Sequence, residues 1–114
     1  MPVDKDLRLV KDYMATDVIT VDADESLRLA EDIMDMGRIR HLPVMRAGKL
    51  VGIVSQRDLF RASLSTLLHH RRADVELFEH SVNIGEIMSD KVVSVSPETP
   101  LKEAAGLMLT EKIG

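Results

Sequence analysis

The chain contains one segment twice, and this internal repeat limits the folds that it can adopt. Residues 10–40 align with residues 84–114 without a gap. The matched apolar residues are those that a strand and a following helix would bury, so both segments should form the same supersecondary unit. Repeated units usually bury their apolar faces against each other. The identical pairs are Met14/Met88, Val18/Val92, Val21/Val95, Leu27/Leu101, Ala30/Ala104, Met34/Met108 and Ile39/Ile113.

In the first copy, the residues predict a strand followed by a helix. Residues 18–21 (VITV) are β-branched and bounded by polar residues, which is typical of a buried strand. The apolar residues from Leu27 to Met34 recur at helical spacing, and the acidic residues before Leu27 suit the positive end of a helix dipole. We expect Gly37 to end this helix.

A hairpin and a second helix should complete the first copy. The apolar runs 41–45 and 49–55 are separated by a short turn, Arg46-Ala47-Gly48, which predicts a β-hairpin. Pro43 cannot donate a hydrogen bond to a sheet ladder, so strand 41–45 should lie at an edge or have its N–H side free. The second helix should begin at Ser55. The first unit therefore reads strand–helix–strand–strand–helix.

The second copy follows a charged connector, residues 69–83, for which we expect a short helix or a turn. Residues 92–95 (VVSV) repeat the strand, and residues 101–112 repeat the helix. Thr99 is expected to cap this helix, with Pro100 as its first residue.

The apolar face of the second copy has no cover of its own in this sequence. No counterpart of the hairpin or of the second helix follows, so one chain can build at most one full copy of any site on those elements. Exposed apolar surface costs ~25 cal/mol per Å² and favours association. We therefore expect the chain to be part of a longer protein; the alternative is that a second chain supplies the cover, through a dimer or a swap. The apolar residues concerned are Leu101, Leu107, Met108, Leu109 and Ile113.

Composition excludes several classes of protein. An apolar content of 45% with 30% charged residues indicates a globular chain. The net charge of −4, one tyrosine and two phenylalanines argue against a nucleic-acid surface. No apolar run approaches the ~20 residues of a membrane span, and the N-terminus does not resemble a signal peptide, so we expect a cytoplasmic protein. There is no cysteine, and no paired carboxylate, nucleophile–base pair or metal cluster is visible, so neither an enzyme nor a metal site is expected.

The most informative local motif is Ser55-Gln56-Arg57-Asp58, directly after an apolar strand. A helix that begins there has free N–H groups at its positive end, which favours an anion. The Ser55 hydroxyl and Arg57 can bind a phosphate, and Asp58 can accept hydrogen bonds from ribose hydroxyls. Gly52 would allow a flat base to approach the backbone. The same Ser-x-x-Asp pattern also caps a helix without any ligand, and the two interpretations are compatible.

Several segments, in this order, resemble the cystathionine-β-synthase (CBS) domain family. The resemblance covers nearly the whole chain and implies a tandem CBS pair whose second domain is truncated. The implied fold class is α/β (α+β), built from β-α-β-β-α units, each a small three-stranded sheet with helices on one face. We expect a first domain at residues 7–68, the connector at 69–83 and half of a second domain at 84–114. The segments that carry the resemblance are 14–21, Ser26-Leu27, 40–44 and 48–59.

The resemblance implies a regulatory module without catalysis. Such pairs bind AMP, ADP, ATP, S-adenosylmethionine or a dinucleotide between domains, change domain orientation, and act on an attached or partnered protein. An adenine nucleotide, AMP or ATP, is the expected ligand, and a homodimer with an unknown regulated partner is expected. The alternative is a dimerisation or interaction module that binds no ligand.

Some site residues are expected from the resemblance alone. In similar proteins a basic residue at the Arg40 position reaches a phosphate; otherwise Arg40 is a solvated arginine near a helix end. His41 can change charge near neutral pH or simply pack at a strand start. The segment of Thr16 and Val18 contacts adenine in the family but can equally be a strand entry. The ligand-binding residues expected are Thr16, Val18, Arg40, His41, Pro43, Ile53, Ser55, Arg57 and Asp58.

Overall fold

The structure is a computed structural model that describes residues 6–69, 77 and 79–113. Most of the connector, residues 70–76 and 78, therefore lies outside the described part, although residues 79–81 are helical as expected. Backbone contacts divide the chain into two compact units. Residues 19–92 form one, here called the sheet unit, and residues 1–18 with 93–114 form the other, here called the terminal unit.

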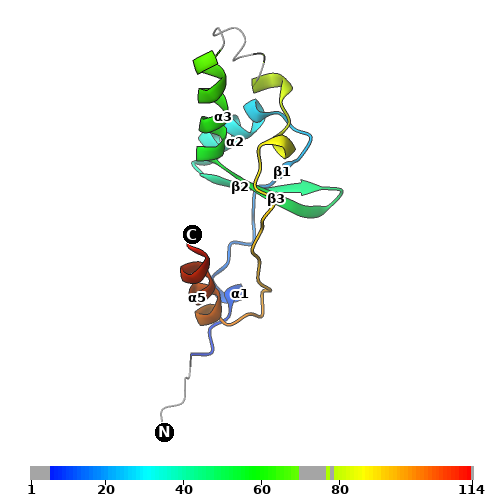
Figure 1. Cartoon of the computed structure of the whole chain (residues 1–114). Helices are drawn as coiled ribbons and strands as arrows, with labels where there is room; N and C mark the ends of the chain where they lie inside the picture. The colour runs from blue at the N-terminus through cyan, green and yellow to red at the C-terminus, as the bar shows by residue number, and fades with distance from the viewer. Residues whose placement is uncertain (1–5, 70–76, 78, 114) are drawn as a thin grey trace. The chain divides into compact units, whose positions relative to one another are not determined.

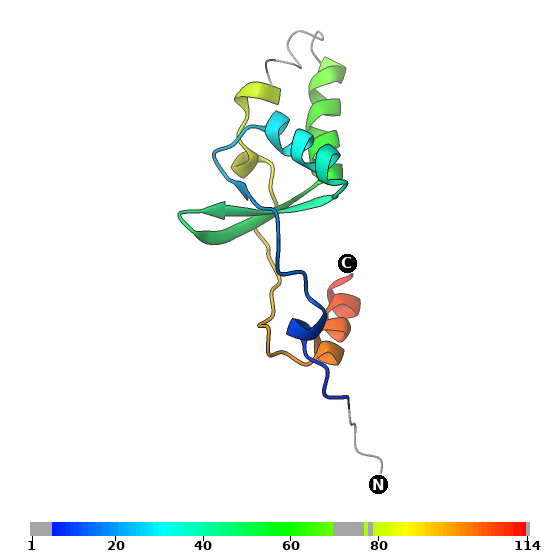
Figure 2. The ribbon, with the colours of Figure 1, turned by 180° about the vertical axis from the view of Figure 1, so that it is seen from behind.

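The sheet unit contains the expected three-stranded sheet, with both helices on one face (Figures 1 and 2). The strand order is β1-β2-β3; β1 runs parallel to β2, and β2 runs antiparallel to β3. Because a parallel pair needs a crossover, a helix stands between β1 and β2 in the chain. The strands are β1 (Val21–Asp22), β2 (His41–Arg46) and β3 (Lys49–Ser55), and the helices are α2 (Leu27–Gly37) and α3 (Gln56–His69).

The core of the sheet unit lies between the sheet and these helices. Alternate residues of β2 and β3 point into it, as the period of a half-buried strand requires. On α2, Leu27, Ala30 and Met34 of the predicted apolar stripe are buried. The buried residues are Val21, Ala23, Leu27, Ala30, Met34, Leu42, Val44, Val54, Leu59 and Ile84.

The predicted hairpin between β2 and β3 is confirmed. Arg46 pairs with Lys49, so the loop has only two residues, Ala47 and Gly48. Both have positive φ angles, 52° and 76°, as a type I′ turn requires. This turn matches the right-handed twist of the strands that it joins.

Pro43 does not lie at an edge, because β2 is the central strand of the sheet. Its partner in the β2–β3 ladder is Ile53, whose own N–H and C=O exchange hydrogen bonds of 2.9 Å with Ser89 instead. The Pro43–Ile53 pair therefore needs no N–H from Pro43. On the other side of β2, pairing with β1 involves only Val44 and Met45. The prediction that strand 41–45 lies at a sheet edge was therefore wrong. The alternative prediction, that the backbone around Pro43 needs no N–H donor on that side, agrees with the structure.

Two strand predictions need correction. Only Val21 and Asp22 form β1, so residues 18–20 of the expected strand 18–21 are not part of the sheet. Residues 92–95 form no strand at all. A strand needs a hydrogen-bonding neighbour. The first copy has one in β2, whereas residues 92–95 have none in the part of the chain that the structure describes.

The helix ends repeat between the copies more closely than the strands do. In α2 the left-handed residue is Arg38, one position after the predicted stop at Gly37, and its counterpart in α5 (Leu101–Glu111) is Lys112. The N–H of the next residue returns to a methionine carbonyl in both helices, from Ile39 at 3.1 Å and from Ile113 at 3.0 Å.

The predicted start of the second-copy helix was shifted by one residue. Pro100 is the cap residue of α5 rather than its first helical residue, and Thr99 makes no cap. The Thr99 hydroxyl instead accepts a hydrogen bond from the Ser96 N–H at 3.1 Å. The carbonyl of Pro100 accepts the first helical hydrogen bonds, from Glu103 and Ala104.

Each unit also contains a short helical turn from the other copy of the repeat. In the sheet unit, η1 (Ile84–Glu86) donates from Ile84 to Glu25 and from Gly85 to Ala23. In the terminal unit, α1 (Val10–Tyr13) makes the equivalent bonds from Val10 to Thr99 and from Lys11 to Pro97. The third bond runs from the Leu27 N–H to the Val82 carbonyl in the sheet unit and from the Leu101 N–H to the Arg8 carbonyl in the terminal unit. Both units thus use the same hydrogen-bond pattern. In each unit the short helical turn comes from one copy of the repeat and the longer helix that follows the bonds comes from the other copy.

Candidate functional site

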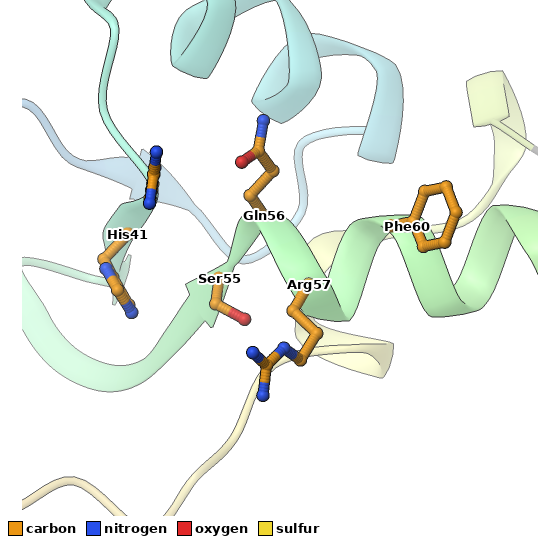
Figure 3. A pocket seen from close by; sticks show the side chains of 6 residues that line it. His41, Ser55, Gln56, Arg57 and Phe60 are labelled. Carbon is orange, nitrogen blue, oxygen red and sulfur yellow. The ribbon is translucent and has the colours of Figure 1, made fainter.

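The candidate site lies where the β2–β3 ladder ends and α3 begins. His41 and Ser55 are partners at the end of the ladder away from the turn. The Gln56 N–H donates to the Arg40 carbonyl at 2.8 Å, which fixes the segment before β2 to the start of α3. A cavity of about 650 Å³ opens at this junction, within the size range of small-molecule sites. Its lining residues are Arg40, His41, Ser55, Gln56, Arg57 and Phe60 (Figure 3).

The Ser-x-x-Asp motif forms a reciprocal cap at the start of α3. The Ser55 hydroxyl oxygen accepts the Asp58 N–H at 3.1 Å, and Asp58 Oδ2 accepts the Ser55 N–H at 2.9 Å. The Gln56 N–H is also occupied, by the Arg40 carbonyl. The expectation of a helix start with free N–H groups was therefore wrong for the Ser55, Gln56 and Asp58 donors, which already have protein acceptors. Any anion at this site must be held mainly by side chains.

Two of those side chains extend to the same side of α3. Figure 3 shows the Ser55 hydroxyl and the Arg57 guanidinium on one side of the helix start, with Gln56 pointing to the other. The Ser55 hydroxyl uses its oxygen as the cap acceptor and keeps its hydrogen as a donor. Arg57 offers a guanidinium that can donate two parallel hydrogen bonds to a phosphate.

The structure brings together four of the residues expected from the sequence and separates the others. Arg40, His41, Ser55 and Arg57 line the same cavity. Asp58 lines a second cavity of about 500 Å³ on the other side of its cap, together with Arg61, Ala62, Val82, Glu86 and Ile87. Pro43 and Ile53 lie half-buried within the hairpin and line neither cavity. Thr16 and Val18 are exposed residues of the terminal unit.

Gly52 serves protein packing in this structure. A Cβ atom there would collide with the Met88 Sδ atom and would lie 2.8 Å from the Ser89 carbonyl oxygen. The segment after η1 can therefore lie directly along β3, where Ser89 exchanges its two hydrogen bonds with Ile53. The expected approach of a flat base to Gly52 is not possible while Met88 occupies that space.

Sequence reasoning missed two lining residues, Gln56 and Phe60. They stand four positions apart on α3, so both lie toward one face of the helix. Phe60 is 64% exposed although it is one of only two phenylalanines in the chain. An exposed aromatic residue one turn beyond a candidate ligand motif is a signal that could have identified it.

The cavity at the start of α3 is electropositive. Its lining contains two arginines and a histidine but no carboxylate. Within the described residues, neither arginine forms an ion pair, whereas Arg28 is paired with three carboxylates and Arg46 with Asp24. The third cavity of the sheet unit, about 200 Å³ between α2 and α3, is acidic instead, because Glu31 and Asp35 line it.

The fold alters the protonation of Glu31 in the sheet unit. Its burial raises the pKa of the Glu31 carboxyl above its usual value, and the nearby Glu79 carboxylate raises this pKa further. The Ser63 hydroxyl lies 3.3 Å from Glu31 Oε1 and 3.5 Å from Glu79 Oε1, and Arg28 partly offsets the repulsion. This cluster joins α2, α3 and the helical residues 79–81, and the cavity that Glu31 lines shares Gln56 and Phe60 with the basic cavity.

The sequence and the fold identify the family of this chain. The family model described as CBS domain matches residues 10–65 and again residues 84–114, so most of the chain is covered in two segments. The chain therefore belongs to the CBS domain family, as a tandem pair.

Individual relatives agree with this assignment. The CBS domain-containing protein YhcV of Bacillus subtilis is 30% identical over 104 residues, which are 91% of this chain and 67% of YhcV. The crystal structure of the CBS domain pair of protein MJ0100, in complex with 5′-methylthioadenosine and S-adenosyl-L-methionine, is 28% identical. It has a TM-score of 0.71 and covers 94% of this chain and 76% of that chain. The crystal structure of CBSX2 in complex with AMP is 25% identical, with a TM-score of 0.73, and covers 92% of this chain and 76% of that chain.

The described residues contain neither a candidate membrane span nor a candidate metal site. None of their helices has the length and apolar character of a membrane-spanning segment. In the same part of the chain, no three His, Cys, Asp or Glu side chains are grouped so that they could hold a metal ion.

Proposed function

We propose that this chain is a non-catalytic regulatory module that binds an adenosine-containing ligand at the start of α3. The observation that carries the proposal is the 650 Å³ cavity lined by Arg40, His41, Ser55 and Arg57, in a chain whose family membership is shown. The proposal is also supported by two structural relatives that bind AMP, S-adenosylmethionine or 5′-methylthioadenosine.

Within this proposal the phosphate is held by side chains. Arg40 and Arg57 approach it from the segment before β2 and from α3, and the Ser55 hydroxyl donates its free hydrogen. AMP or ATP is the ligand that we propose, and no other cofactor is required.

The ribose and adenine contacts rest on the family resemblance. Asp58 Oδ2 is used by the cap, so only Oδ1 remains to accept a ribose hydroxyl. Because Asp58 lines the neighbouring cavity, this role requires a ligand that extends around the first turn of α3 from Ser55. The adenine contacts of Thr16, Val18, Pro43 and Ile53 stay predictions.

We further propose that the bound ligand acts by shifting the populations of two domain orientations. A ligand can shift such an equilibrium only by its difference in affinity for the two states. We also propose that the chain forms a homodimer, is located in the cytoplasm and regulates a partner protein.

Calorimetric titration with adenosine, AMP, ADP, ATP and S-adenosylmethionine tests the proposal, and Asp58→Asn tests the ribose contact. An asparagine can keep the cap through its amide oxygen but places an NH₂ group where the ribose needs an acceptor. We expect this variant to weaken nucleotide binding about tenfold, the loss of one charge-assisted hydrogen bond, with a melting temperature close to that of the wild type.

Unchanged affinity in Asp58→Asn would reject the ribose role. If the folded wild type binds none of the five compounds, the proposed function fails. The remaining interpretation is then a dimerisation module without a ligand, which light scattering can examine directly.

A further inference from the structure

The cavity of about 200 Å³ between α2 and α3 has no role in the proposed ligand site. It is smaller than the ~300–1,000 Å³ of typical small-molecule sites, but it can take one long side chain. The two helices that form it lie side by side in both views of the ribbon (Figures 1 and 2). We call this cavity the acidic groove; it is lined by the carboxylates of Glu31 and Asp35 and by the apolar side chains of Met34, Leu59 and Phe60, with Gln56 and Ser63 beside them.

The acidic groove carries negative charge that the described residues do not neutralise. Asp35 forms no ion pair within the part of the chain that the structure describes. Glu31 has Arg28 at 3.8 Å, but the same guanidinium also pairs with Asp32 at 3.4 Å and with a third carboxylate, that of Glu79, at 3.5 Å. Burial and then the Glu79 carboxylate raise the pKa of the Glu31 carboxyl, as expected where negative charge lacks full compensation. A cation in the groove would relieve this repulsion.

Apolar surface lies next to this charge. Met34 and Leu59 are each 2% exposed and form the base of the groove, whereas Phe60 is 64% exposed. Leu64 is 38% exposed and stands one turn after Phe60, so both lie toward the same face of α3. Such a surface can cover the methylene stem of a lysine or arginine while the carboxylates face its charged end. A guanidinium can also stack on an aromatic ring.

We propose that the acidic groove is a docking site for an arginine side chain of a partner protein. Arginine suits the groove because its planar guanidinium can donate to carboxylates and stack on Phe60, and arginine is enriched in protein interfaces. The partner segment should carry apolar residues beside this arginine, because Phe60 and Leu64 are exposed next to the groove. The inference deepens the proposed function and rests on it in one respect, the existence of a regulated partner.

The position of the groove suits a partner that responds to a ligand. Gln56 and Phe60 line both the acidic groove and the basic cavity at the start of α3. A partner in the groove and a ligand in the basic cavity would therefore contact the same two side chains. This gives each of them a physical route to change the affinity for the other.

The test is a nuclear magnetic resonance titration of the labelled full chain, without any nucleotide, using two peptides. One is acetyl-Leu-Ala-Arg-Leu-Ala-amide, and the other has citrulline, which resembles arginine in shape but has no charge, in place of the arginine. We expect the arginine peptide to shift the backbone amides of Glu31, Asp35 and Ser63 in a saturable manner. It should bind at least about fivefold more tightly than the citrulline peptide, because only the arginine makes charge-assisted hydrogen bonds to the carboxylates.

A matched pair of variants locates the effect. Asp35→Asn removes one negative charge from the groove, and Asp90→Asn removes the same charge from an exposed position that lines none of the cavities described above. Asp35→Asn should weaken the arginine peptide at least about threefold and the citrulline peptide less than about twofold, while Asp90→Asn should change neither by more than about twofold.

Every other outcome overturns the docking site. Equal affinities for the two peptides, shifts that lie away from α2 and α3, or no shifts at millimolar peptide would each do so. Agmatine, a free guanidinium amine, is a third probe, and if it binds as tightly as the arginine peptide, the groove takes a small amine and not a protein segment. Because these titrations contain no nucleotide, their failure leaves the adenosine-binding proposal intact, and a failure of the nucleotide titrations leaves the docking site intact.

Discussion

At the scale of single residues, the sequence indicated the side chains that line the basic cavity better than the packing around them. Ser55 and Arg57 were predicted from one local motif, and Arg40 from the family resemblance, and the fold places all three at one cavity. The contact between Gly52 and Met88 could not be predicted, because the two residues are far apart in the sequence. Gln56 and Phe60 were missed because their place in the lining of this cavity depends on the course of α3 in the fold.

Gly52→Ala should destabilise the sheet unit. The added Cβ would meet the flexible Met88 side chain but also the Ser89 backbone, which is paired to β3 and cannot move freely. We expect a loss of about 1–3 kcal/mol in unfolding free energy, measured by urea denaturation. Gly106→Ala in α5 is the matched control, since no atom beyond its chain neighbours and the nearby backbone of its own helix lies within 4 Å of its Cβ position, and it should stabilise by about 0.5–1 kcal/mol. Equal effects of the two variants would contradict this account of Gly52.

Glu31→Gln should make stability less sensitive to pH. Because the folded state raises the pKa of Glu31 above its usual value of 4.5, its charged form costs stability at neutral pH. That cost is relieved as the pH falls through the raised pKa toward 4.5. The variant should therefore be more stable than the wild type at pH 7, and its advantage should shrink on acidification. A thermal-melting series over this pH range is the measurement, and an advantage that grows on acidification would refute the assignment.

At the scale of elements, local signals predicted the helices and the hairpin, whereas strands depended on partners. The apolar runs 41–45 and 49–55 and the short turn were sufficient for the hairpin. Residues 92–95 have the same β-branched character as residues 18–21, yet neither run forms the expected strand in full. A strand is stabilised by its neighbour, and a short run of residues does not reveal whether a neighbour exists.

Ala47→Asn should stabilise the hairpin. Ala47 has a φ angle of 52° in the first central position of a type I′ turn, a conformation that alanine adopts at a cost. Asparagine tolerates this conformation and gives the Asn-Gly pair that such turns favour. We expect an increase of up to about 1 kcal/mol in unfolding free energy, read from the urea midpoint. A loss of stability would show that the turn is not the type assigned here.

At the scale of the whole molecule, the repeat predicted the architecture but not which copy supplies each piece. Aligning residues 10–40 with 84–114 shows that two similar units exist, and the matching helix ends and hydrogen-bond sets agree with it. An alignment carries no information about contacts between copies, so the transfer of η1 to the sheet unit could not be predicted. The domain limits 7–68 and 84–114 stay predictions.

Ile84→Ala should therefore weaken a core formed largely by the other copy. Ile84 is fully buried among residues of the first copy, and truncating it leaves a cavity. We expect a loss of about 2–5 kcal/mol, seen as faster native-state hydrogen exchange at the Val44 and Val54 amides. The counterpart variant Val10→Ala, at a partly exposed position, should leave those amides unaffected. Equal acceleration by both variants would contradict the division into units.

The most direct test of the central claim is a nuclear magnetic resonance titration of the labelled chain with ATP. If the ligand binds at the start of α3, the largest shifts should occur at the backbone amides of His41, Gln56 and Arg57. The shifts should saturate with a single dissociation constant that adenosine alone does not reproduce. Saturable shifts confined to residues away from this cavity, or no shifts at all, would contradict the account.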